Sequence, residues 1–242
     1  MNFIQSWRRR RKHLRHSSKF AAKYPYNLEP SQFVTLVEAI DALADKPGCI
    51  VEVGCYRGWS TMFVCEHLKK AYPKNPPPYY ALDTFDSFVG GQLDHEVAKR
   101  SKVRKELEGF FNNDYDIWSS NFKNYPFVRA IKADCANFSF SQLGPIKVAL
   151  LDVDLYVPTA AALAQVYPAL VDGGVILVDD VRSVPVLDDP YPYDGAHQAY
   201  MEFCAAHELS PAFVGTKCGL IRRESGTDKK RNVSRVDAAA LA

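Results

Sequence analysis

Short apolar runs alternate along this chain with longer segments of helical periodicity. The apolar runs cover residues 49–54, 79–83, 127–134, 146–154 and 173–181. Continuous apolar runs of this length are typical of strands that are buried on both faces of a parallel sheet. Strands that alternate with helices in this way predict a mainly parallel α/β sheet with right-handed crossovers.

The segments between these runs carry apolar residues at helical spacing. Helices are predicted over residues 33–44, 60–72 and 195–207, within 97–111, and between the fourth and fifth strands. Residues 211–216 and 217–223 predict an antiparallel terminal hairpin. We therefore expect one α/β domain over residues 25–223, in which the long polar connection 84–125 forms a lid or insertion.

Positive and negative charges nearly balance over the whole chain, but basic residues are concentrated at its two ends. The chain has 30 Lys and Arg residues against 28 Asp and Glu, a net charge of +2, so nucleic acid is not expected as an obligatory partner. We expect residues 1–24 to form a basic, partly disordered arm and residues 224–242 a disordered tail. The alternatives for the arm are an organelle transit peptide or a contact with anionic surfaces, and such an arm can also mediate a homodimer.

Two further observations concern the cellular compartment. No window is apolar for long enough to span a bilayer, and the N-terminus lacks the apolar core of a secretory signal. The six cysteines form no Cys-x-x-Cys pair, so we interpret them as small buried hydrophobic residues rather than as disulfides or zinc ligands. A cytoplasmic protein without a transmembrane segment is expected.

Acidic residues stand at the ends of the predicted strands. One strand closes on Asp152 and Asp154, and another closes on Asp179 and Asp180. Parallel strands deliver such residues to one carboxyl edge of the sheet, where ligands bind. Carboxylates gathered there repel each other unless a cation, a proton or a hydrogen-bond donor relieves them. The segment therefore predicts a charged site.

A glycine turn follows the first strand, in residues 52–60 (EVGCYRGWS). Gly54 and Gly58 allow a sharp turn into a helix whose N-terminus can face a ligand. The turn lacks the GxGxxG pattern of a dinucleotide site, and Glu52 beside it suits an ammonium group better than a phosphate. An acid such as Asp83 commonly accepts hydrogen bonds from ribose hydroxyls, and Asp134 would flank an adenine. Each acid alone could equally cap a helix, and the turn could bind nothing.

These residues resemble the macrocin O-methyltransferase family of class I S-adenosylmethionine-dependent enzymes. The motifs that carry the resemblance are residues 52–60, 82–85, 151–159 and 173–180, with Gly195, Ala196, Ala199 and Phe203 in the following helix. The resemblance implies a Rossmann-like, mainly parallel seven-stranded sheet with helices on both faces. It also implies an S-adenosylmethionine site at Glu52, Gly54, Tyr56, Gly58, Ser60, Asp83, Asp134 and Asp152. A divalent metal, usually magnesium, would be bound by Asp152, Asp179 and Asp180.

The chain departs from the pattern of that family in three places. Val153 stands where the family usually has glycine between the first two acids. After Asp-Thr-Phe the family usually continues with Gly-Leu-Pro, whereas this chain has Asp86-Ser87-Phe88-Val89. The loop after Asp180 is longer than usual. The last two departures concern the acceptor pocket and hence the substrate.

Methyl transfer to a hydroxyl requires a group that takes the proton. We nominate His95, within the insertion, as the first candidate for this base and His197 as the second, with a plain surface histidine as the alternative for His95. Asp152 is expected to take part in catalysis as well as in binding, and Asp154 to orient the metal shell. Tyr156 and Trp59 are candidates for the wall of the donor pocket, or else for the core.

The leading hypothesis is an S-adenosylmethionine- and divalent-metal-dependent O-methyltransferase. Its acceptor would be a hydroxyl of a sugar or another polyhydroxylated small molecule, such as a glycoside. One alternative is a metal-independent class I methyltransferase that acts on a different acceptor. The other is a non-catalytic module that binds nucleotides or anionic surfaces through the basic arm.

Overall fold

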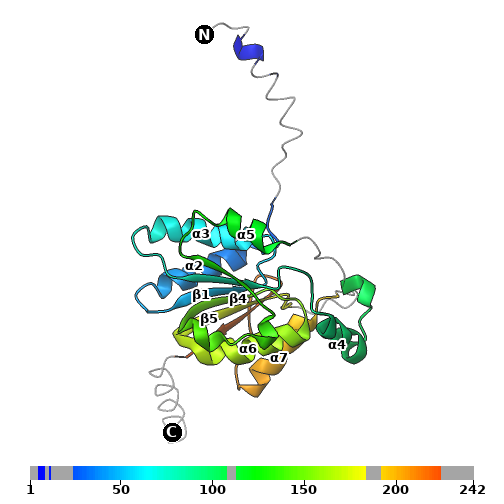
Figure 1. Cartoon of the computed structure of the whole chain (residues 1–242). Coiled ribbons are helices and arrows are strands. Elements are labelled where there is room, and N and C mark those ends of the chain that lie inside the picture. Colours follow the sequence, from blue (N-terminus) through cyan, green and yellow to red (C-terminus); the bar gives the residue numbers. More distant parts are fainter. Residues whose placement is uncertain (1–4, 9–10, 12–23, 108–112, 184–191, 225–242) are drawn as a thin grey trace, which may run out of the picture.

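The computed structural model describes residues 5–8, 11, 24–107, 113–183 and 192–224 (Figure 1). Residues 5–8 and 11 are helical, and the rest of the predicted arm up to residue 23 lies outside the described residues. The predicted tail lies outside them beyond residue 224. The predictions of a disordered arm and a disordered tail therefore stay predictions.

A single seven-stranded sheet organises the domain, with the strand order β3-β2-β1-β4-β5-β7-β6. Strands β1 to β5 pair in parallel, whereas β7 is antiparallel to both β5 and β6. This confirms the mainly parallel sheet and the terminal hairpin. The strands are β1 Cys49–Val53, β2 Tyr79–Asp83, β3 Val128–Lys132, β4 Ile146–Leu151, β5 Leu170–Asp179, β6 Ala212–Val214 and β7 Cys218–Arg222.

Helices cover both faces of the sheet. Figure 1 shows α2, α3 and α5 on one face and α6 and α7 on the other. Short 3-10 turns η1, η2 and η3 lie at Arg104–Leu107, Cys135–Asn137 and Phe140–Leu143. The α-helices are α2 Pro30–Ala42, α3 Trp59–Ala71, α4 Gly90–Arg100, α5 Tyr115–Asn121, α6 Tyr156–Ala169 and α7 Gly195–Ala206.

Alternate strand residues pack into two separate hydrophobic clusters. Ile50 and Leu150 belong to the cluster under α2 and α3, whereas Val51 and Ala149 belong to the cluster under α6 and α7. Successive strand side chains point to opposite faces, so a strand covered on both sides is apolar throughout. This explains why β1 and β4 are fully buried and are apolar apart from Glu52 and Lys147. Packing on both faces of the sheet also fixes the positions of the strand ends, which carry the acids.

The predicted insertion differs from its expected structure. The helix predicted within 97–111 is instead α4, which begins at Gly90 and ends at Arg100. It ends there because Ser101 adopts a left-handed conformation, with φ of 57°, and donates its N–H back to the Glu96 carbonyl. A second helix, α5, was not predicted, because its seven residues are too few to show clear periodicity. Residues 108–112 lie outside the described residues.

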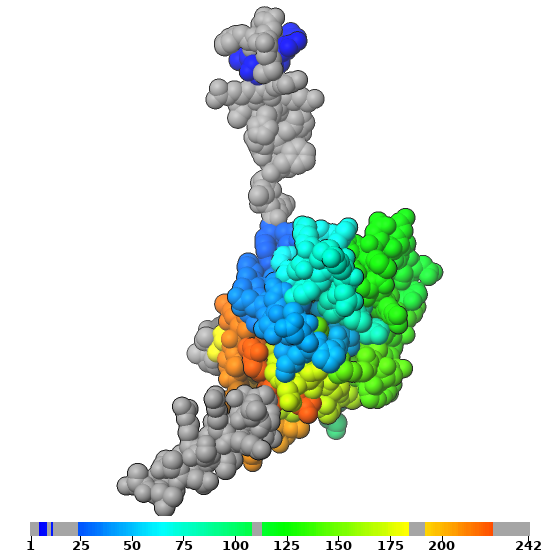
Figure 2. Space-filling view, turned by 90° about the vertical axis from the view of Figure 1, so that its left-hand side faces the viewer, coloured from blue at the N-terminus to red at the C-terminus, as the bar shows by residue number. Residues whose placement is uncertain are grey.

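Helix α2 packs beside the terminal hairpin of β6 and β7. In Figure 2 the early, blue part of the domain lies next to the late, orange part. The side chain of Glu29 accepts a hydrogen bond from the Thr216 N–H at 2.9 Å. Gln32, one turn into α2, is completely buried and reaches the end of β5. In the described part of the chain, no helix combines the length and the apolar character that a membrane crossing requires.

Candidate active site

A cavity of about 400 Å³ opens at the carboxyl ends of β1, β2, β4 and β5. A second cavity, of about 260 Å³, lies beside it toward the start of α2 and α3. The two share four lining residues: Asn27, Gly54, Tyr56 and Asp152. The carboxyl edge of a parallel sheet is where ligands bind in this class of fold, so the position agrees with the expectation from the strand-end acids.

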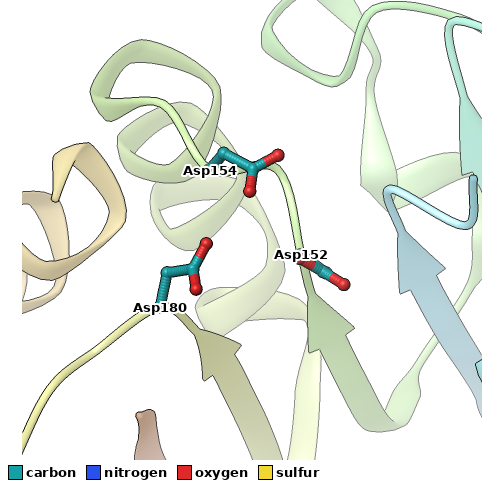
Figure 3. A group of neighbouring side chains, drawn as sticks. All are labelled: Asp152, Asp154 and Asp180. Carbon is teal, nitrogen blue, oxygen red and sulfur yellow. The ribbon is translucent and has the colours of Figure 1, made fainter. Parts of the chain in front are cut away.

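Three aspartates come together in the larger cavity, as Figure 3 shows. Asp152 follows β4, Asp154 lies on the turn into α6, and Asp180 follows β5. One carboxylate oxygen of each lies within 4.8 Å of the others. Asp154 and Asp180 both have φ of 59°, a left-handed conformation that turns the chain sharply at the ends of the strands. The sheet therefore converts two distant sequence motifs into one acidic cluster.

The carboxylates of this cluster repel one another, so each disfavours the ionised form of its neighbours. Burial raises the pKa of Asp152 well above its usual value, and the charges of Asp179 and Asp180 raise it further. Burial likewise raises the pKa of Asp154, with added repulsion from Asp152 and Asp180. A bound cation would relieve this repulsion. Three carboxylates form a hard oxygen donor set of the kind that magnesium and calcium prefer, so these residues fit a divalent metal.

Asp179 lies outside this group of three, although the resemblance implied it as a ligand. Its carboxylate accepts hydrogen bonds from Gln32 Nε2 and Lys217 Nζ, both at 2.7 Å. Burial raises the pKa of Asp179 to about 6, with a further rise from Asp180, while Lys217 lowers it. Lys217 Nζ also lies 3.6 Å from Asp180. The observed cluster therefore contains Asp154 in place of the expected Asp179, because α2 and the hairpin already supply partners for Asp179.

The glycine turn after β1 brings the backbone close to this cluster. Gly54 has φ of 84°, and a side chain there would overlap the carbonyl oxygen of Asp152. Asp83, at the end of β2, accepts hydrogen bonds from the N–H groups of Tyr56 and Phe85, both at 2.8 Å. The carboxylate of Asp83 thus fixes the turn after β1 and its own following loop. Asp83, Gly54 and Tyr56 all line the larger cavity.

Two residues of the expected donor site lie elsewhere. Glu52 is completely buried, and its carboxylate accepts hydrogen bonds from Ser60, Thr61 and Tyr79. Gly58 packs under the rings of Phe122 and Trp118. Neither is among the described residues that line the two cavities. Glu52 therefore holds the start of α3 against β1 and β2, Gly58 provides space for α5, and a donor contact for either residue stays a prediction.

The other expected donor residues do line a cavity. Asp134 lines the larger one and Ser60 the smaller one. Asp134 accepts a hydrogen bond from Gln92 Nε2 at 2.9 Å. Gln92 lies on α4 and lines the same cavity, so the insertion supplies part of the wall. No sequence pattern pointed to Gln92, because its contact depends on how the insertion folds back onto the end of β3.

Neither histidine nominated as the base lies at a cavity wall. His95 stacks on Tyr156, with ring centroids 5.4 Å apart and nearly parallel planes. The Nδ1 of His197 is buried without a partner among the described residues, and burial lowers the pKa of this histidine. Both are absent from the described linings, as is Tyr156, whereas Trp59 lines the smaller cavity. The structure therefore places neither histidine in the lining of the two cavities, and the role of a base stays a prediction for both.

The family of the chain follows from its similarity to known proteins. The model of the Macrocin-O-methyltransferase (TylF) family matches residues 31–209. The chain belongs to this family. The family consists of S-adenosylmethionine-dependent O-methyltransferases, which confirms the resemblance seen in the sequence motifs.

The chain is similar in sequence to a curated protein from Streptomyces olivaceus. It is the 8-demethyl-8-(2,3-dimethoxy-alpha-L-rhamnosyl)-tetracenomycin-C 4'-O-methyltransferase, which is 27% identical over 161 residues. The matched region covers 64% of this chain and 61% of the relative, so the chain spans less than two thirds of that protein.

Solved structures share the fold of this macrocin O-methyltransferase family member. The O-methyltransferase NovP is 18% identical, with a TM-score of 0.61 over 81% of this chain and 80% of its own. The calicheamicin methyltransferase CalS11 is 16% identical, with a TM-score of 0.63 over 88% of this chain and 92% of its own. These similarities confirm the methyltransferase fold with its antiparallel C-terminal strands.

Proposed function

We propose that this protein is an S-adenosylmethionine- and divalent-metal-dependent O-methyltransferase that acts on a sugar hydroxyl. The observation that carries the proposal is the cluster of Asp152, Asp154 and Asp180. It lies within a cavity that Gly54, Asp83 and other residues expected to bind the methyl donor also line. The cluster and these residues could thus serve one reaction centre.

The donor would occupy both cavities. S-adenosylmethionine supplies an electrophilic methyl group on a sulfonium carrying an adenosine at one end and an amino acid at the other. Asp83 and Asp134 line the larger cavity and offer carboxylates to ribose and adenine, respectively. Tyr56 and Asp152 line both cavities, and Ser60 lines the smaller one, where the amino-acid end would lie. The negative charges nearby favour a cationic ligand.

Asp152 and Asp180 are the proposed metal ligands. Magnesium is commonly bound through one or two carboxylates together with water and substrate oxygens, so two ligands suffice. A divalent cation held there would bind the acceptor hydroxyl and lower its pKa.

Asp154 is the proposed proton acceptor. It lines the larger cavity, and one of its oxygens lies within 4.8 Å of the Asp152 and Asp180 oxygens. Its carboxylate therefore lies beside the position at which the proposed metal ligands would hold the acceptor hydroxyl, and a carboxylate so placed can act as a general base. The proton of the acceptor hydroxyl would pass to Asp154 as the new C–O bond to the methyl carbon forms and its bond to sulfur breaks. This proposal replaces His95 and His197 in that role.

Two relatives support a sugar as the acceptor. The Streptomyces olivaceus relative is a 4'-O-methyltransferase of a rhamnosyl-tetracenomycin, and CalS11 is described as a TDP-rhamnose 3'-O-methyltransferase. The substrate is a glycoside in the first case and a nucleotide sugar in the second, so the two agree on a rhamnose ring but not on the group attached to it. A cavity that combines carboxylates with apolar walls suits such a ring.

Calorimetry tests the donor site. Titration of S-adenosylmethionine into the full chain, with and without magnesium, is expected to show saturable binding in both cases. The Asp83→Asn variant is expected to bind at least about tenfold more weakly, because one carboxylate is replaced by an amide. Absence of binding by the unmodified protein in both buffers would contradict the proposal and favour a non-catalytic module.

One observation favours a second candidate function, a metal-independent methyltransferase. Lys217 lies 2.7 Å from Asp179 and 3.6 Å from Asp180, so its ammonium group already neutralises part of the acidic site. Turnover that persists unchanged in a strong chelator would favour this candidate. Turnover that disappears with the chelator would favour the metal-dependent enzyme.

A further inference from the structure

The two sequence segments that depart from the family pattern near the acceptor meet in the structure. Phe88 belongs to the first and Tyr193 to the loop that follows Asp180. The centroids of their rings lie 6.2 Å apart, with the ring planes tilted by 44°. Both side chains line the larger cavity. They therefore form an aromatic wall, defined here as Phe88 and Tyr193, in the cavity that contains the acidic cluster.

Tyr193 lies close to the acids of the cluster. It is partly buried, and burial raises the pKa of its phenol, with further contributions from the charges of Asp154 and Asp180. Tyr193, Asp154 and Asp180 all line the larger cavity. A ligand that contacts Tyr193 would thus reach the proposed metal and base.

The aromatic wall is fastened to the body of the domain. Phe88 and Tyr193 pack against a small hydrophobic cluster of Leu93, Leu107 and Leu155. Asp194, next to Tyr193, forms ion pairs with Arg100 and, at 2.8 Å, with Lys102. Because α4, the turn before α6 and the start of α7 all hold it, the wall is preformed rather than assembled by a ligand.

We propose that the aromatic wall binds the ring face of a neutral pyranoside and directs one of its hydroxyls toward Asp154 and Asp180. This inference rests on the proposed methyltransferase function and specifies its acceptor site. A pyranose presents C–H groups on its ring faces and hydroxyls at its edge, so an aromatic face can hold the ring while carboxylates or a metal take the edge. The carboxylates that line this cavity disfavour an anionic group on the acceptor by repulsion between like charges, so the expected preference differs from that of CalS11, whose TDP-rhamnose carries a diphosphate.

Direct binding of a simple sugar tests the proposal. Methyl α-L-rhamnopyranoside is titrated by calorimetry into the full chain with S-adenosylhomocysteine and magnesium, and α-L-rhamnose 1-phosphate serves as the anionic probe. Phe88→Ala and Tyr193→Ala are each expected to raise the Kd for the neutral sugar by about tenfold or more, as the loss of a buried aromatic contact usually does. Tyr193→Phe keeps the ring and is expected to retain most of the affinity.

The control is Phe213→Ala, which removes a partly exposed ring of β6 that is not among the described lining residues. It is expected to leave the sugar affinity unchanged. If Tyr193→Ala fails to fold, Tyr193→Leu replaces it and keeps the apolar volume without the aromatic face.

Two results would overturn the inference. One is a sugar affinity that the Phe88 and Tyr193 variants leave unchanged, and the other is the absence of any neutral-sugar binding by the unmodified protein. Tighter binding of the phosphate than of the neutral sugar would contradict the selection for neutral acceptors. Failure of the underlying function is distinguishable, because a separate titration of S-adenosylhomocysteine into the same protein would then show no binding.

Discussion

Asp152 and Asp154 are neighbours in the acidic cluster, but their backbones differ. Asp152 continues the hydrogen bonding of the sheet, with its N–H donating to the Val53 carbonyl at 2.8 Å. Asp154 has a left-handed conformation, and its carbonyl accepts from the Ala196 N–H at 3.0 Å. One residue extends the strand and the other turns toward α7. The two carboxylates are thus presented from different backbone settings, and we propose separate roles for them as ligand and base.

Conservative amide substitutions separate these roles. Asp152→Asn is expected to weaken magnesium binding by about tenfold or more, because a charged ligand is lost. Asp154→Asn is expected to keep most of the magnesium affinity and to lower kcat by about 10² to 10⁴, the usual contribution of a general base. Calorimetry measures the first effect and steady-state kinetics the second. The reverse pattern, with metal binding lost only in Asp154→Asn, would make Asp154 a ligand.

Gly54 is predicted to tolerate no side chain. Its φ of 84° is costly for other residues, and an alanine methyl group would overlap the Asp152 carbonyl. We expect Gly54→Ala to lose S-adenosylmethionine binding in calorimetry, because the turn must move away from Asp152. Gly91→Ala, on α4 with open space around it, is the matched control and should keep donor binding. Equal donor affinity in the two variants would contradict this role of the turn.

The sequence predicted the strand-end acids but not which of them face a ligand. Asp83, Asp134, Asp152 and Asp180 stand at cavity walls as expected. The carboxylate of Glu52, by contrast, accepts hydrogen bonds from hydroxyl groups of α3 and β2. These contacts depend on side chains from different elements, and no local pattern records them. The roles of the residues that do line the cavities remain predictions until measured.

At the scale of elements, α4 is joined to the domain by buried charges. Glu96 is completely buried, accepts the N–H of Tyr156 at 2.7 Å and pairs with Arg100 at 2.7 Å. The carboxylate thus lies at the positive end of α6, where a negative charge is favourable. Arg100 in turn pairs with Asp194 at the start of α7. The insertion, α6 and α7 are therefore held together beside the acidic cluster.

Glu96→Ala is expected to destabilise the protein by about 3–5 kcal/mol, because Arg100 would remain buried without this partner. The free energy of unfolding in urea measures the effect. Asp94→Asn is the control, since the pair between Asp94 and Arg104 is exposed and should contribute no more than about 1 kcal/mol. A similar decrease in the free energy of unfolding in both variants would show that the buried ion pair contributes no more to stability than the exposed one.

Elements with strong periodicity were predictable, whereas the insertion was not. The five parallel strands and the hairpin follow from apolar runs in the sequence, of which the structure buries β1 and β4 on both faces, whereas β3 and β6 at the edges of the sheet stay partly exposed. In the insertion, α4 is set by polar contacts such as Glu96 with Arg100, and α5 by rings that pack over Gly58. Contacts of this kind are tertiary, so they leave little periodic signal in the sequence.

At the scale of the whole molecule, the order of the strands creates the site. Because β4 lies between β1 and β5, the acids that follow β4 and β5 meet beside the glycine turn that follows β1. The hairpin then adds Lys217 from the far edge of the sheet. The family pattern could predict that metal and donor sites adjoin. The position of Lys217, which pairs with Asp179 and links it to the hairpin, could be learned only from the folded structure.

The most direct measurement is transfer of a labelled methyl group from S-adenosylmethionine to methyl α-L-rhamnopyranoside. The full chain is assayed with magnesium, then after removal of metal by a chelator, and again after magnesium is restored. The account predicts labelled O-methyl product with magnesium, little or none after chelation, and recovery when magnesium returns. Product formation at the same rate in the chelator, or no product under any of the three conditions despite donor binding, would contradict it.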